Sequence, residues 1–154
     1  VFDVLLNVLY NFFPDIIDKK IDLEYLESNS KAYFDYEAIQ VALFHILDNT
    51  MKYIKENTKL TIALQEKDQN IEIIFDMTSL KVGDDELEKI FIEGFSGEYA
   101  KKNGKSGKGI GMSRVKQILN LNKGDILLKN TKILNDDEYS NNVFILTLPK
   151  DENE

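Results

Sequence analysis

The sequence has no cysteine and only one histidine, His45. Disulfides, thiolate metal sites and a cysteine nucleophile are therefore excluded, and so is a metal centre built from several histidines. The absence of cysteine suits the reducing cytoplasm, where we expect this domain to lie even if its parent protein is anchored in a membrane.

The sequence also lacks an apolar run long enough to span a bilayer. Its first segment, residues 1–13, is apolar but too short, and no basic residues precede it as they would in a signal peptide. Asp3, Asn7 and Asn11 recur in it at helical spacing, which predicts a packed amphipathic helix. The chain begins at Val1 without a methionine, so we expect it to come from a longer protein.

Positive charge is scarce except in one segment. The net charge is −8, which argues against a nucleic-acid partner. Residues 96–116 nevertheless carry six basic side chains and one acidic side chain, a local charge of +5 that leaves −13 for the rest of the chain. A basic island on an acidic chain indicates a local anion site.

The 154 residues suit one domain, which we expect to span residues 1–150 and to be followed by an acidic tail at 151–154. Hydrophobic periodicity predicts helices at 1–13, 36–54, 84–91 and 113–120, with Asp35 as an N-cap and Pro14 redirecting the chain. It predicts strands at 21–25, 31–34, 60–64, 71–75, 126–129 and 143–148. This order predicts a two-layer α/β sandwich of the α+β class, with a mixed, mostly antiparallel sheet.

Glycine is concentrated in one place. Six of the eight glycines lie between Gly94 and Gly111, and the last three, Gly107, Gly109 and Gly111, directly precede a predicted helix. Glycines let the backbone approach a phosphate and point N–H groups at it, and a helix N-terminus adds positive potential. The alternative is a flexible surface loop. The segment is not a dinucleotide fingerprint, because no strand precedes it, and it lacks the complete P-loop pattern.

Two further groups of polar residues are candidates for chemistry. His45, Asn49, Lys52 and Tyr53 share one face of the predicted long helix. An amide such as Asn49 can complete an oxygen shell around Mg²⁺, although a buried, hydrogen-bonded histidine explains part of the same pattern. Asp76 follows an apolar strand, where its carboxylate either accepts a hydrogen bond from an amino group at the floor of a pocket or forms a turn.

Three segments occur in an order that resembles the family uniting gyrase, the Hsp90 chaperones, histidine kinases and mismatch-repair ATPases. Residues 44–53 (FHILDNTMKY) resemble the N box of that family. Residues 90–95 (IFIEGF) resemble the F box of histidine kinases, and residues 107–112 (GKGIGM) resemble the G2 box. The similarity extends from about Phe2 to Pro149, and it favours the ATP-binding catalytic domain of a sensor histidine kinase.

The resemblance implies a role for each matched residue. Asn49 would hold the Mg²⁺ that bridges the ATP phosphates, and His45 stands where gyrase and the chaperones carry a water-activating glutamate, so His45 and Asn49 are the expected catalytic pair. Residues 96–106 would form a lid over the nucleotide. The expected ATP contacts are Asn49, Lys52, Tyr53, Asp76, Phe91, Lys105, Gly107, Lys108, Gly109, Ile110, Gly111 and Met112.

One box departs from the family pattern. Histidine kinases carry Asp-x-Gly-x-Gly after the strand, whereas residues 76–80 here are DMTSL, so both glycines are missing. The spacing from Asp76 to Phe91 is also slightly long. We therefore expect a reshaped adenine pocket.

The resemblance implies transfer of the γ-phosphate of ATP to a histidine on a separate dimerisation domain, with a response regulator as a further partner. This chain supplies no such histidine, and the isolated domain is expected to be monomeric. Three alternatives stay open: a non-catalytic nucleotide-sensing or interaction module, a protein serine kinase of the same fold, and a hydrolase, which His45 in place of glutamate disfavours.

Overall fold

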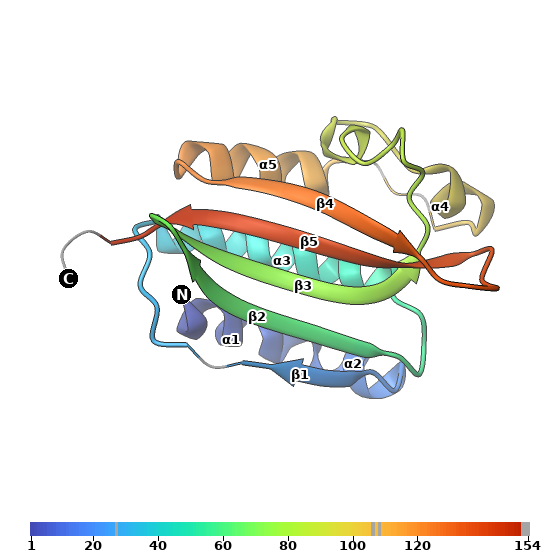
Figure 1. Cartoon of the computed structure of the whole chain (residues 1–154), viewed down its shortest axis with the longest axis horizontal. Helices are drawn as coiled ribbons and strands as arrows, with labels where there is room; N and C mark the ends of the chain where they lie inside the picture. Colours follow the sequence, from blue (N-terminus) through green and yellow to red (C-terminus); the bar gives the residue numbers. More distant parts are fainter. Residues whose placement is uncertain (27, 106, 108, 152–154) are drawn as a thin grey trace.

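The computed structural model describes residues 1–26, 28–105, 107 and 109–151. Five strands form one sheet in the order β1-β2-β3-β5-β4 (Figure 1). Their bounds are β1 (Asp22–Tyr25), β2 (Lys59–Lys67), β3 (Asn70–Leu80), β4 (Asp125–Lys132) and β5 (Tyr139–Pro149). The β1–β2 pair is parallel and the other three pairs are antiparallel. The predicted mixed, mostly antiparallel sheet is confirmed.

The longer helices cover one face of this sheet, which gives the predicted two layers (Figure 1). They are α1 (Phe2–Leu9), α2 (Phe13–Asp18), α3 (Tyr36–Tyr53) and α5 (Gly111–Leu121), with a 3₁₀ turn, η1 (Tyr10–Phe12), between the first two. A short helix, α4 (Glu98–Lys102), and a second 3₁₀ turn, η2 (Lys89–Phe91), precede α5. Among the described residues, no helix is both long and apolar enough to cross a bilayer.

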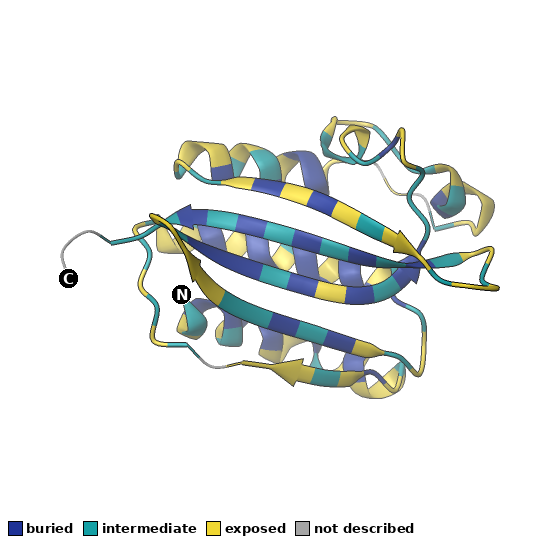
Figure 2. Ribbon diagram, viewed as in Figure 1, coloured by how far each residue is buried: buried dark blue, intermediate teal, exposed yellow. Residues whose placement is uncertain are grey.

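The core lies between the helices and the sheet, and the strands alternate accordingly. Figure 2 shows buried and less buried residues alternating along β5, where Asn142, Phe144, Leu146 and Leu148 are buried and the residues between them are not. Successive side chains of a strand point to opposite faces, so the buried set faces the helices. In β3 the set that faces the helices includes Phe75, Met77 and Ser79.

Helix α3 carries the central apolar stripe, with Leu43, Ile46 and Leu47 fully buried or nearly so. Asp35 is its N-cap, as predicted, and its carboxylate accepts the backbone N–H of Ala38 at 3.0 Å. The backbone N–H of Asp35 donates to the side-chain oxygen of Asn122 at 2.7 Å. Since Asn122 is the C-cap of α5, this bond joins the start of α3 to the end of α5.

Four expectations about local structure need correction. Residues 84–91 form only turns and η2, because glycine and aspartate favour the turn in which the N–H of Glu86 donates to the carbonyl of Gly83 at 2.8 Å. Residues 31–34 make only an isolated bridge, Ala32 with Lys150. The first helix ends early, and Pro14 lies in the first turn of α2, where its missing N–H costs nothing. Helix α4 was not predicted.

Candidate functional site

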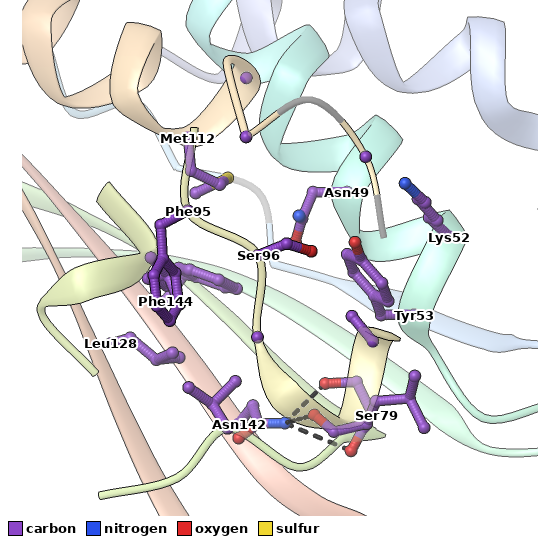
Figure 3. A pocket seen from close by; sticks show the side chains of 18 of the residues that line it. Asn49, Lys52, Tyr53, Ser79, Phe95, Ser96, Met112, Leu128, Asn142 and Phe144 are labelled. Atoms are coloured by element: carbon purple, nitrogen blue, oxygen red, sulfur yellow. Dashed lines mark hydrogen bonds between the residues drawn. The ribbon is translucent and has the colours of Figure 1, made fainter. Parts of the chain in front are cut away.

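A cavity of about 340 Å³ opens between the C-terminal half of α3, the end of β3 and the start of β5. The glycine-rich segment (residues 94–111), which leads into α5, forms its remaining side. Its volume is in the range of small-molecule sites. Figure 3 shows Asn49 and Lys52 toward one end and Ser79 and Asn142 toward the other. Of the predicted site residues, the cavity is lined by His45, Asn49, Lys52, Tyr53, Gly107, Gly109, Ile110, Gly111 and Met112.

The polar face of α3 points toward the glycine-rich segment. A Cβ atom on Gly107 would lie 2.9 Å from Nζ of Lys52, so the ammonium group sits against that backbone. The same ammonium group lies 5.3 Å from the centre of the Tyr53 ring. The Tyr53 hydroxyl donates a hydrogen bond to the carbonyl oxygen of Lys105 at 3.0 Å. Residues more than 50 positions apart are thereby brought to one site.

His45 lies on α3 beside the first turn of α5. A Cβ atom on Gly111 would lie 3.5 Å from Nδ1 of its ring. Partial burial lowers the pKa of His45 from its ordinary value of 6.5, the positive charge of Arg114 lowers it further, and the carboxylate of Asp48 opposes both effects. His45 is therefore neutral at pH 7 and can accept a proton or a hydrogen bond in the cavity.

The backbone path of the glycine-rich segment requires a glycine at position 109. Its φ is +69°, and an added Cβ would lie only 2.5 Å from the carbonyl oxygen of Phe95. The carbonyl of Gly109 accepts the N–H of Gly94 at 3.1 Å, and this hydrogen bond holds the two ends of the segment side by side. Helix α5 begins two residues later, and its first N–H groups add positive potential beside the cavity.

The other end of the cavity is mostly apolar, with Met77, Leu128 and Phe144 in its lining. Two buried polar residues, Ser79 and Asn142, also line it. The Asn142 amide nitrogen donates to Ser79 Oγ at 2.7 Å and lies 3.3 and 3.1 Å from the carbonyl oxygens of Ser79 and Leu80 (Figure 3). Neither residue was predicted from the sequence, although Asn142 is a polar residue on the inward-facing side of an otherwise apolar strand.

Asp76 does not line this cavity, so its predicted position at the pocket floor is wrong. It is exposed, and its Oδ1 accepts a hydrogen bond from the Asn141 side chain at 2.7 Å. Because strand residues alternate, Asp76 lies on the face of the sheet opposite the helices, while its neighbour Met77 faces the cavity. A carboxylate at position 77 would face the cavity, whereas the carboxylate at position 76 lies on the opposite side of the sheet.

Two other predicted contacts, Phe91 and Lys105, also differ from expectation. Phe91 does not line the cavity, and its ring lies 5.7 Å from Nζ of Lys116 on α5. Lys105 contributes its carbonyl oxygen to Tyr53, and it does not line the cavity. Lys108 lies outside the described residues, as do Ser106 of the predicted lid and residues 152–154 of the predicted tail.

The predicted lid contains α4, and a buried carboxylate holds the start of this helix. Glu86 accepts the backbone N–H of Glu98, with its two oxygens at 3.4 and 3.3 Å. A Cβ on Gly97 would lie 3.0 Å from Glu86 Oε2, so there is little room at this contact. Glu86 therefore acts as an N-cap supplied by a different part of the chain.

The chain is similar to known proteins in sequence and in fold. The chain is 26% identical over 87 residues to the sensor protein CiaH of Streptococcus pneumoniae, which is 56% of this chain and 20% of that relative. The chain thus spans about a fifth of the length of this curated relative. The solved structure of the mycobacterial sensor histidine kinase MprB matches with a TM-score of 0.80 at 17% identity, over 96% of this chain and 93% of that one.

A second solved structure is the histidine kinase ThkA in complex with the response regulator protein TrrA. It matches with a TM-score of 0.75 at 19% identity, over 98% of this chain and 40% of that one. The profile of the histidine kinase-, DNA gyrase B- and HSP90-like ATPases matches residues 34–152. The chain belongs to this ATPase family, and the similarity to sensor kinases makes it an ATPase domain of the histidine kinase type.

Proposed function

We propose that the cavity binds Mg-ATP and that the domain donates the γ-phosphate to a histidine of a separate dimerisation domain. The observation that carries this proposal is the convergence of Asn49 and Lys52 with the glycine-rich segment on one cavity. Backbone N–H groups, a lysine and a helix N-terminus are the groups that bind phosphates, and phosphoryl transfer depends mainly on positioning and charge neutralisation. The catalytic domain would comprise residues 1–150, with 151–154 as its acidic tail.

The residues present fit Mg²⁺ held largely through phosphates. Among the described residues, no group of three or more His, Asp, Glu or Cys side chains is placed to hold a metal by itself. Mg²⁺ typically takes one or two protein oxygens and completes its shell with phosphates and water, and the Asn49 amide oxygen, which lines the cavity, would be the protein ligand. When bound, the ion would offset negative charge on the phosphates.

The protein's own groups would have distinct roles. Lys52 would neutralise a phosphate oxygen, and the N–H groups around Gly109 and Gly111 would hold the others. The neutral ring of His45 would accept a hydrogen bond, and so position an attacking group or water, without adding charge. The complex of ThkA with TrrA supports a response regulator as the downstream partner of the full protein.

The test is thermal unfolding of the domain with Mg-ATP, Mg-ADP and no nucleotide. A ligand that binds only the folded state raises the midpoint, and at a hundred times Kd it adds about 2.7 kcal/mol. Asn49→Ala should reduce the shift strongly, and Asn120→Ala, on the exposed surface of α5 and outside the cavity lining, should not. No shift of the natural domain at millimolar nucleotide would contradict the proposal.

Transfer is tested separately from binding. The domain is incubated with labelled Mg-ATP and a histidine-containing dimerisation fragment, and the product is exposed to acid. Phosphohistidine is acid-labile, so loss of the label supports the kinase, and an acid-stable label indicates a serine kinase. Binding without transfer would favour a nucleotide-sensing module, which the absence of Asp76 from the cavity also favours.

A further inference from the structure

The two ends of the cavity differ in chemistry, and this difference orients a nucleotide if the proposed function is correct. Lys52, Asn49 and the glycine-rich segment provide charge and N–H groups at one end. The other end has apolar walls, Met77, Leu128 and Phe144. A purine ring has apolar faces and polar edges, so it suits the second end, where its edge meets Ser79 and Asn142.

No carboxylate reaches the base end among the lining residues that the structure describes. Asp48 is the single carboxylate in that lining, and it lies on α3 next to Asn49, at the phosphate end. A carboxylate only accepts hydrogen bonds when ionised, so it selects a base that carries an amino group. The described lining therefore offers the base end no ionised carboxylate.

The Asn142 side chain has its nitrogen already committed to the protein. Its nitrogen faces two carbonyl oxygens and Ser79 Oγ, which fixes the orientation of the amide. Its oxygen accepts the hydroxyl of Ser140 at 3.1 Å. The Ser79 hydroxyl, in contrast, accepts one bond from Asn142 and keeps its own hydrogen and a second lone pair.

We propose that Ser79 reads position 6 of the purine and that the site therefore accepts 6-amino and 6-oxo purine nucleoside triphosphates alike. A hydroxyl rotates to suit its partner, so it accepts from the amino group of adenine and donates to the oxygen of hypoxanthine or guanine. A site built around one fixed acceptor rejects the wrong partner because buried polar groups are left unpaired. Ser79 leaves the position-6 group of neither kind of base unpaired.

The test compares Mg-ATP with Mg-ITP, whose bases differ in the group at position 6 and in the hydrogen on N1, but not in size. Titration calorimetry of the whole chain should give dissociation constants within about tenfold of each other, where a dedicated polar site discriminates by about 10⁴ or more. Preference for ATP by more than about tenfold would overturn the inference and leave the nucleotide site intact. Binding of neither nucleotide by folded protein would instead contradict the proposed function, and the inference with it.

Variants of Ser79 separate recognition from folding. Ser79→Ala should weaken both nucleotides by a similar factor, because it removes one hydrogen bond from each complex. Ser79→Asp should raise the preference for ATP by about tenfold or more, because a carboxylate accepts only. Thr78→Ala is the control, since its side chain lies on the other face of β3 and outside the cavity lining. A change of ratio in Ser79→Ala, or no change in a folded Ser79→Asp, would contradict the role of Ser79.

Discussion

Gly109 and Gly104 have the same left-handed backbone conformation, with φ of +69° and +64°, but different surroundings. Atoms of Gly94 and Phe95 crowd the place where a Cβ of residue 109 would lie, whereas nothing lies within 4 Å of one at residue 104. The two positions therefore separate the effect of backbone conformation from the effect of space.

We expect Gly104→Ala to lower the free energy of unfolding by about 1–2 kcal/mol, the ordinary cost of a left-handed L-residue. Gly109→Ala should cost more, about 3 kcal/mol or above, because the crowding atoms belong to the backbone and cannot rotate away. Urea unfolding of both variants measures the difference. Equal losses would show that Gly94 and Phe95 move aside freely.

The lowered pKa of His45 makes the stability of the folded protein depend on pH. Its folded-state pKa lies below 6.5, so the folded protein resists protonation of this ring. The stability that His45 contributes is therefore complete above pH 6.5 and is lost as the pH falls from there through the folded-state pKa. A titration followed by NMR should give a pKa below 6.5. Arg114→Gln should raise it, and Asp48→Asn should lower it further. The opposite order would contradict this account.

At the scale of elements, α4 depends on a partner outside itself. Five residues are too few for a stable isolated helix, and its N-cap residue, Gly97, has no side chain to bond the first N–H groups. The carboxylate of Glu86 takes that role from the preceding segment. The conformation of the predicted lid is thus set partly by a residue that precedes it in the chain.

Glu86→Ala should therefore loosen α4. Loss of an N-cap costs about 1 kcal/mol, which corresponds to roughly fivefold faster hydrogen exchange of the amides in residues 98–102. Glu88→Ala is the control, because Glu88 is exposed in the same segment. Exchange rates are measured by mass spectrometry or NMR, and equal rates in both variants would remove Glu86 from this role.

The sequence predicted the presence of the longer elements, because their patterns span many residues. Helix α3 and its N-cap were predicted within one residue, whereas the strands that form β2 and β3 were predicted shorter than they are. Short segments were predicted poorly. Helix α4 depends on Glu86, and the helix formers at positions 86–89 do not make residues 84–91 helical, because so short a helix depends on packing more than on propensity. Local propensity could not supply these contacts.

The error at Asp76 has a different cause. The strand was predicted to end at Phe75, which left Asp76 free to turn into the pocket, but β3 continues to Leu80 along β5. Extending the alternation Ile71, Ile73, Phe75 by one step puts Met77 on the buried face and Asp76 on the other. That signal was present in the sequence. The hydrogen bond between Ser79 and Asn142 was not predictable in this way, because it depends on the register between β3 and β5.

The site exists because the fold brings several separate parts of the chain together, β4 with Leu128 among them. The α3 face, the end of β3, the glycine-rich segment and β5 all line one cavity. Composition indicated a local anion site within residues 96–116, but only family resemblance indicated that this segment meets α3. Convergence of this kind depends on tertiary packing, which periodicity does not describe.

The bond between Asn122 and Asp35 adds a link between α3 and α5, which also pack against each other. It fastens α3 and α5 at the ends that lie away from the glycines. When two helices rotate about a link at one end, the displacement of a residue grows with its distance from that link. Each residue along a helix adds about 1.5 Å to this distance. Asn49 and Gly111 lie toward the opposite ends of these helices, so any rotation about the linked ends would displace the mouth of the cavity most.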